Sequence, residues 1–228
     1  AWWSGGIASA VTCYFCIMWF GVENVGVVFI ETHNEDDDTY RFLKECEQWY
    51  GCNIETIMST KYDNIEDVWY DSLSLNLANG AKCTEVLKIA VRQQFIKRNK
   101  YSYNAFGYDM TEVERAKDMN KSNYHLRPIY PLIASLYNKK DCLNVIERAN
   151  DMFLSITVPK AYLLGYNNNN CFKTGCVKGG IGYWQKIQID DPAKFDAMAV
   201  REHEISDLKG EPVTMLKDQA EGGGLLFL

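Results

Sequence analysis

The sequence predicts an α/β fold, with a Rossmann-like, doubly wound parallel sheet followed by an irregular region rich in cysteine and glycine. Short apolar segments alternate with segments of helical periodicity, which is the pattern that βαβ units produce. The run at 25–30 is apolar throughout and is typical of a strand covered on both faces. With 228 residues, 47% of them hydrophobic, the chain is long enough to bury a substantial core.

Each expected element follows from periodicity or from a turn signal. Trp2 and Trp3 end a short buried strand, and a Ser-Gly-Gly turn leads directly into the first helix. Leu87, Val91 and Phe95 recur every four residues and predict an amphipathic helix. The expected helices span residues 7–20, 38–50, 84–98, 111–119, 139–149 and 192–206, and the expected later strands span 25–30, 54–58 and 103–107, with 129–132 extended.

Two features predict boundaries in the second half of the chain. Thr111 and Glu114 fit a capping box, which starts a helix there. After Pro159 the periodicity is lost in a stretch rich in Gly, Asn and Cys. We therefore expect residues 1–160 to form a nucleotide-binding α/β domain, and residues 161–228 to form a Cys/Gly-rich loop and a C-terminal helix packed on the same domain.

The segment Ser4–Ser9 predicts a phosphate site. A strand, a glycine turn and a helix N-terminus together favour an anion, because glycines let backbone N–H groups crowd a phosphate and the helix dipole attracts negative charge. Ser4 and Ser9 add hydroxyl donors, and a purely structural tight turn is the alternative. Glu31–Asn34 and Gly107–Asp109 follow other strands and are expected to border the same crevice, since ligands of such sheets bind beyond the carboxyl ends of the strands.

Most of the eight cysteines are expected to be ordinary small core residues. Cys13 and Cys16 lie among apolar residues of the first helix, which favours core packing over redox or metal chemistry. Cys171 and Cys176 lie in a glycine-rich loop, and Cys83 precedes a helix N-terminus that stabilises a thiolate. These three predict an Fe–S cluster, with zinc as the less favoured metal, against the alternative of unrelated loop thiols.

Charged side chains supply candidate ligands for anions and for magnesium. Lys88 and Arg92 share one helical face and are suited to a sulfate, a phosphate or a nucleic-acid backbone, or else to a solvated face. Arg115 is suited to a polyphosphate or to a surface ion pair with Glu112. The acidic run 35–38 is suited to Mg²⁺ or, as the favoured alternative, to capping of the next helix.

The bulk properties exclude some classes of protein. The net charge of −6 and the pI of about 5.2 argue against a basic nucleic-acid coat, although a local basic patch stays open. No apolar run reaches transmembrane length and no secretory signal is evident, so we expect a cytoplasmic protein with no membrane partner.

Together these residues resemble the adenosine phosphosulfate (APS) and phosphoadenosine phosphosulfate (PAPS) reductase family, within the PP-loop ATP pyrophosphatase (adenine nucleotide alpha hydrolase-like) superfamily. The pattern from Asn169 to Trp184 looks like a subgroup frequent in bacteria and their phages. The matching segments are Ser4-Gly5-Gly6-x-x-Ser9 for the PP-loop, Cys83-x4-Lys88 for the cysteine-plus-lysine stretch, Gly107 to Arg115 for the G-x-R-x-x-E-S-x-x-R region, and Cys171 with Cys176 for the second cysteine pair.

The resemblance implies an enzyme that binds ATP or PAPS/APS and acts in sulfonucleotide reduction or ATP-dependent sulfur transfer. A non-catalytic or nucleic-acid-modifying PP-loop protein, partnering DNA or tRNA thiolation, is the alternative, and a homodimer is left open. The implied roles are nucleotide binding for Ser4, Gly5, Gly6, Ile7, Ser9, Glu31, Thr32, Gly107 and Tyr108, catalysis for Lys88, Arg92 and Arg115, and ligation of a [4Fe-4S] cluster for Cys83, Cys171 and Cys176.

The sequence departs from the family pattern at two positions and lacks one motif. Ala8 stands where the PP-loop usually has Asp, which puts ATP pyrophosphatase chemistry in doubt but not phosphate binding by the backbone. Thr84 stands where cluster-bearing members have a second cysteine, so three of four ligands match. The printed sequence contains no Glu-Cys-Gly-x-His-like motif, which supplies the attacking cysteine in the family.

Overall fold

The computed structural model describes residues 1–77, 80–152, 155–217 and 224–228. The chain forms two compact units and passes between them several times. Unit 1 contains Ala1–Ile30, Glu35–Ile57 and Phe95–Asn170. Unit 2 contains Glu31–Asn34, Met58–Gln94 and Cys171–Leu228. The domain boundary expected at residue 160 stays a prediction.

The predicted α/β class with parallel strands is confirmed. Strands β1 (Trp2–Trp3), β2 (Val28–Glu31) and β3 (Glu55–Met58) form one sheet in the order β1-β2-β3, and β1 runs parallel to β2. Strands β4 (Asn104–Ala105) and β5 (Pro128–Ile129) form a second parallel pair. A hydrogen bond of 3.0 Å from Trp2 Nε1 to Asn104 Oδ1 joins β1 to β4 within unit 1.

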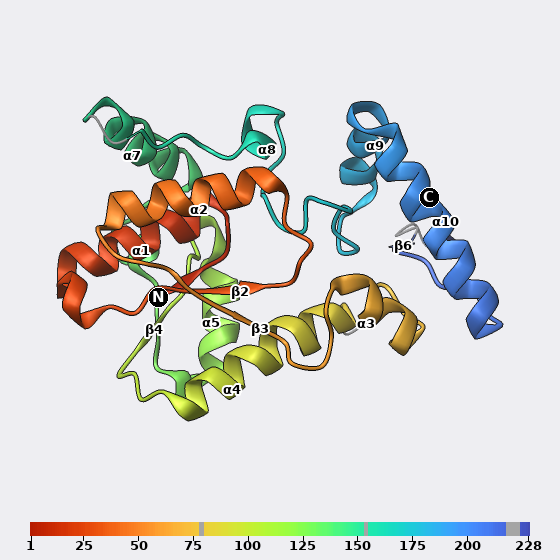
Figure 1. Ribbon diagram of the computed structural model, residues 1–228, viewed down its shortest axis with the longest axis horizontal. Coiled ribbons are helices and arrows are strands. Elements are labelled where there is room, and N and C mark those ends of the chain that lie inside the picture. The colour runs from red at the N-terminus through yellow and green to blue at the C-terminus, as the bar shows by residue number, and fades with distance from the viewer. Residues whose placement is uncertain (78–79, 153–154, 218–223) are drawn as a thin grey trace. The chain divides into compact units, whose positions relative to one another are not determined.

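Helix α1 (Ile7–Phe20) begins and ends at glycines, as the sequence predicts. It contacts α2 (Asp37–Tyr50), α6 (Pro131–Ala134) and α7 (Lys139–Asp151), so apolar residues occur on several of its faces. In Figure 1, α1 and α2 run side by side along the strands. The other helices of unit 1 are α5 (Val113–Ser122), α8 (Lys160–Leu163) and the 3₁₀ turns η1 (Val22–Asn24), η3 (Met110–Glu112) and η4 (Tyr124–Leu126).

The core of unit 1 forms around the end of β1. Trp3 is 2% exposed and packs edge-on against Phe29 at a centroid distance of 5.2 Å. Cys13 and Cys16 are buried in α1, and burial raises the pKa of both thiols, which confirms their interpretation as core residues.

Unit 2 contains the helices α3 (Ile65–Ser72), α9 (Ile181–Asp190) and α10 (Pro192–Lys209), and the antiparallel strands β6 (Leu216–Lys217) and β7 (Leu225–Leu226). The helix expected at 84–98 is present, but its first part, η2 (Thr84–Ile89), is π-helical and continues into α4 (Ala90–Arg98). The fully buried Glu202 of α10 accepts hydrogen bonds from the backbone N–H groups of Met215 and Leu228 at 2.6 and 2.7 Å.

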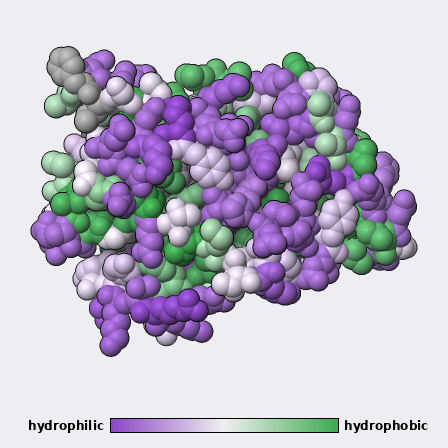
Figure 2. All heavy atoms as spheres, in the orientation of Figure 1, coloured by the Kyte–Doolittle hydropathy of each residue, from purple (hydrophilic) through white to green (hydrophobic). Residues whose placement is uncertain are grey.

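Among the described residues, no helix is both long enough and apolar enough to cross a membrane. On the face drawn in Figure 2, hydrophilic side chains predominate, and apolar side chains occur in small groups between them.

Candidate functional site

The turn between β1 and α1 is built around Gly5. Its φ of +79° lies in the left-handed region, and a Cβ atom there would approach Thr39 Cγ2 to 2.7 Å. Both the conformation and the space therefore require glycine at this position.

The first backbone donors of α1 have no side-chain cap, because Gly6 is the N-cap residue. The Ile7 N–H donates to Tyr162 Oη at 3.3 Å. Within the described parts of the chain, the N–H groups of Gly5, Gly6, Ala8 and Ser9 hydrogen-bond to no acceptor. Donors of this kind at the positive end of a 14-residue helix form an anion-binding arrangement.

Ser9 acts on the turn itself. Its Oγ donates to the Gly6 carbonyl at 2.8 Å and accepts from the Ser4 N–H at 3.0 Å and the Ser4 hydroxyl at 3.1 Å. Ser9 is buried, whereas Ser4 is exposed. Ser9 therefore fixes the shape of the turn, and Ser4 is the hydroxyl that remains accessible to a ligand.

Asn169, near the C-terminal end of the unit 1 sequence, hydrogen-bonds to the turn. Its Nδ2 donates to the Gly5 carbonyl at 3.1 Å and to Thr39 Oγ1 at 2.9 Å, and the residue is 2% exposed. Sequence reasoning missed Asn169 and Tyr162, because an asparagine in a run of four and a tyrosine after a proline resemble ordinary loop residues. No local sequence pattern marks a buried polar residue that contacts a turn so far away in the sequence.

The end of β4 packs directly on the start of α1. A Cβ atom on Gly107 would lie 2.7 Å from Ser9 Cα, so only glycine allows this approach. Tyr108, the next residue, stacks on Tyr130 at 5.6 Å between ring centroids. The two glycine motifs that the sequence predicts at one crevice, at residues 4–9 and at 107, are thus adjacent.

Arg115 is held in a surface ion pair. Its guanidinium lies 2.6 Å from Glu112 Oε1 and 4.4 Å from the centre of the Tyr108 ring, and its side chain is 64% exposed. The capping box expected at Thr111 and Glu114 is wrong. The capping box lies two residues earlier in the chain, with Asp109 as the N-cap residue and Glu112 as its partner.

Glu31 and Thr32 belong to unit 2 and are buried. A carboxylate oxygen of Glu31 accepts the His33 N–H at 2.7 Å, where His33 adopts a left-handed φ of 54°. The acidic residues that follow stabilise the start of α2. Asp36 is the N-cap residue of that helix, and Asp38 forms an ion pair with Arg41 at 2.6 Å. The observed contacts are those of helix capping, the alternative that the sequence favoured over Mg²⁺ binding.

Unit 2 also brings Lys88, Cys171 and Cys176 together. Lys88 Nζ lies 3.7 Å from Cys171 Sγ, and hydrogen bonding with Cys176 together with burial raises the pKa of the Cys171 thiol. Lys88 lies in the π-helical segment, and such segments often occur at functional sites. Arg92 follows one turn later, in α4.

The predicted metal ligands do not form a complete donor set. Cys83 is buried, and burial together with the nearby Cys171 raises the pKa of its thiol. In the described ranges, however, no three His, Cys, Asp or Glu side chains are placed to hold one metal ion. Thr84 offers no thiolate as a fourth ligand. The described residues therefore provide no complete ligand set for a [4Fe-4S] cluster, and the metal assignment stays a prediction.

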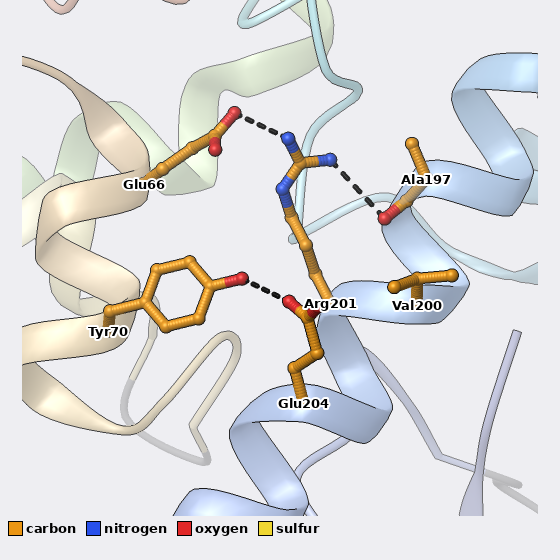
Figure 3. Close-up of a pocket in the computed structure, with 6 residues that line it drawn as sticks. All are labelled: Glu66, Tyr70, Ala197, Val200, Arg201 and Glu204. Atoms are coloured by element: carbon orange, nitrogen blue, oxygen red, sulfur yellow. Dashed lines mark hydrogen bonds and ion pairs between the residues drawn. The ribbon is translucent and has the colours of Figure 1, made fainter.

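A separate open pocket of about 290 Å³ lies between α3 and α10 in unit 2 (Figure 3). Arg201 pairs with Glu66 at 2.7 Å, and the Tyr70 hydroxyl donates to Glu204 at 2.5 Å. These contacts tie the two helices together and pair the charges that line the pocket. None of the predicted site residues lines it.

Comparison with known proteins identifies the family and the fold. The family model for the phosphoadenosine phosphosulfate reductase domain matches residues 1–129. A similar fold occurs in the crystal structure of PAPS reductase from Candida auris, a phosphate complex, with 14% sequence identity, a TM-score of 0.50, and coverage of 73% of this chain and 77% of that chain. None of the curated proteins matches the chain significantly. Since the family match spans more than half of the sequence, the chain belongs to the phosphoadenosine phosphosulfate reductase domain family.

Proposed function

We propose that the chain binds an adenine nucleotide, PAPS/APS or ATP, with a phosphate or sulfate group at residues 4–9, and that it acts in sulfonucleotide reduction or sulfur transfer. The observation that carries this proposal is the set of backbone N–H groups of Gly5, Gly6, Ala8 and Ser9, which have no acceptor within the described residues. They stand at a helix N-terminus, where an anion is favoured. The solved phosphate complex of the Candida auris reductase is consistent with an anion site on this fold.

The proposed roles of the remaining residues follow from their position and charge. Gly107 packs against the turn from the end of β4, and we assign Tyr108, the next residue, to the same nucleotide site. Lys88, Arg92 and Arg115 are proposed to hold anionic groups of the substrate, and Glu31 and Thr32 to contact the adenosine. Fixed cations stabilise charge that develops during group transfer.

Substituting Ser4 tests the anion site without removing a backbone donor. Ser4→Asp places a carboxylate beside the proposed phosphate, and two like charges about 4 Å apart repel by about 1–4 kcal/mol in water or near a protein surface. We expect affinity for PAPS, APS or ATP, measured by calorimetry, to fall at least tenfold. The variant should stay folded, because an acidic side chain near a helix N-terminus is favourable.

Ser4→Asn is the matched control, since it has nearly the same size as Asp and no charge. Ser102→Asp, on an exposed loop residue of unit 1, controls for net charge. We expect Ser102→Asp to bind like the wild type, and Ser4→Asn to bind more tightly than Ser4→Asp. Equal affinity of the Asp and Asn variants at Ser4, or no binding of any of the three nucleotides by the wild type, would contradict the proposal.

The second candidate is a non-catalytic or nucleic-acid-modifying PP-loop protein, and Ala8 is the observation that favours it. Sulfite release from PAPS or APS with a thiol reductant, and pyrophosphate release from ATP with Mg²⁺, distinguish the two when measured with and without DNA or tRNA. Turnover without nucleic acid favours the first candidate. No turnover, with tight and steeply salt-dependent nucleic-acid binding, favours the second.

A further inference from the structure

One surface of unit 1 is positively charged, although the chain as a whole is acidic. The chain has 24 Lys and Arg against 30 Asp and Glu, but residues 95–108 and 119–138 contain five Lys or Arg and no acidic residue. One of the five, Lys121, pairs with Asp118 at 3.6 Å. The others are exposed and form no ion pair with any described residue; they are Lys97, Arg98, Lys100 and Arg127.

Strand pairing brings the two stretches together at one end of the β4–β5 pair. The strands are parallel, with Asn104 opposite Pro128, so the residues that precede each strand lie at the same edge. The Asn104 N–H donates to the Arg127 carbonyl at 3.3 Å, and its Nδ2 donates to the Leu126 carbonyl at 2.8 Å. Gly107, which packs against the phosphate turn, follows β4. The charged surface therefore lies at the opposite end of β4 from that turn.

Three exposed tyrosines lie among these cations. Tyr101, Tyr103 and Tyr124 are 44, 59 and 78% exposed. Tyr101 stacks on the buried Phe95 at 6.0 Å between ring centroids, and a Cβ atom on Gly26 would approach its hydroxyl to 2.8 Å, so contacts within unit 1 fix its position. Proteins that bind single-stranded nucleic acid combine aromatic rings, on which bases stack, with cations that follow the phosphates.

Arg127 has a backbone conformation that arginine rarely adopts. Its φ is 46°, in the left-handed region, and Pro128 follows it. Its N–H donates to the Tyr124 carbonyl at 3.0 Å, so a short turn holds it in this conformation. Strained residues of this kind occur often at binding sites. Here the strained residue presents an exposed charge, which is a second indication that this edge binds a ligand.

We propose that residues 97–103 and 124–127 form a surface that binds single-stranded nucleic acid, with the four cations at phosphates and the three tyrosines stacked on bases. Cations alone fit any polyanion, including a duplex or an acidic protein, whereas exposed flat rings favour unstacked bases. The surface is the local basic patch that a net charge of −6 leaves open. It gives the second candidate function a defined binding surface, and it does not rest on nucleotide binding at residues 4–9.

Fluorescence anisotropy with a labelled single strand of about 20 nucleotides, as DNA and as RNA, tests the proposal on the full chain. We expect the affinity to fall with salt, with a slope of log affinity against log salt of up to about −2.8 for four phosphate contacts. A duplex of the same sequence should bind more weakly, because its bases are already stacked.

Substitutions at exposed positions separate the charges from the rings. Arg127→Asn removes one cation and introduces a residue that tolerates a left-handed φ, so we expect lower affinity and a slope that is shallower by about 0.7. Tyr103→Ala should lower affinity by about fivefold or more without changing the slope. Tyr103→Phe retains the ring and should bind like the wild type.

Two further variants control for net charge. Ser102→Asp adds a negative charge within the surface and should weaken oligonucleotide binding severalfold. Lys140→Gln removes an exposed cation from α7, which lies away from β4 in Figure 1, and should bind like the wild type. Nucleotide affinity of both variants, measured by calorimetry, should equal that of the wild type, so this proposal and the nucleotide proposal fail separately.

Four outcomes would overturn the proposal. Wild-type protein that binds neither single strand at low salt needs no variant to fold. Equal losses of affinity in Arg127→Asn and Lys140→Gln would show an effect of net charge alone. Wild-type affinity in Tyr103→Ala, or a duplex bound as tightly as the single strands, would exclude base stacking. Polyglutamate bound as tightly as the single strands would identify a surface for acidic proteins instead.

Discussion

Replacing Gly107 with alanine measures how closely the end of β4 packs on the start of α1. The new Cβ atom would lie 2.7 Å from Ser9 Cα, 2.8 Å from the Ser9 nitrogen and 3.1 Å from the Ala8 carbonyl carbon. All three are backbone atoms, so no side-chain rotation relieves the contact. Overpacking of this kind costs about 1–3 kcal/mol. In a chain of this length that lowers Tm by roughly 2–12 °C.

Thermal unfolding followed by circular dichroism is the assay, and calorimetric nucleotide binding is the second readout. Gly182→Ala is the control, because a Cβ atom there meets nothing within 4 Å and the residue lies in helix α9. We expect that variant to be as stable as the wild type or more stable by up to about 1 kcal/mol. If Gly107→Ala and Gly182→Ala unfold at the same temperature, the packing argument is refuted.

Two further substitutions test buried hydrogen bonds. Asn169→Ala leaves the Gly5 carbonyl without its 3.1 Å donor. We expect the free energy of unfolding, measured by urea titration, to fall by about 1–3 kcal/mol and nucleotide binding to weaken. Unchanged values of both would contradict the role of Asn169. Burial raises the pKa of Glu202 above its unfolded value of 4.5. The stability from this shift is therefore fully present below pH 4.5 and is lost as pH rises through the folded pKa. Urea titrations should show the unfolding free energy of the wild type falling relative to Glu202→Gln from pH 4 to 7, and parallel pH profiles would exclude this linkage.

The helices that sequence predicts best are those with strong local signals. Helix α1 begins and ends at the residues expected from its flanking glycines and apolar composition, and α2 ends at Gly51 with a left-handed φ of 67°. Helix α9 was not predicted, because it follows a glycine-rich loop and contains Gly182 near its start. Its Trp184 packs against Gly175, so tertiary contact rather than propensity accounts for its position.

The candidate site likewise contains residues that local sequence signals predict and residues that they do not. The Ser-Gly-Gly turn is recognisable because its conformation and its donors are encoded in adjacent residues. Asn169, which holds the turn, lies 164 residues from Gly5 in sequence, and nothing local distinguishes it from its solvent-exposed neighbour Asn168. Arg115 forms the surface ion pair with Glu112 that the sequence offered as one of two alternatives, and its role toward a phosphate stays a prediction.

Binding and chemistry are separable in this turn. The groups that face the proposed phosphate are backbone N–H donors, which depend on the conformation of Gly5 and on the close packing of Gly107, and not on the side chain at residue 8. Ala8 therefore removes a carboxylate without altering the donors. Any reaction at this site must draw its reacting groups from elsewhere in the chain or from a second reactant.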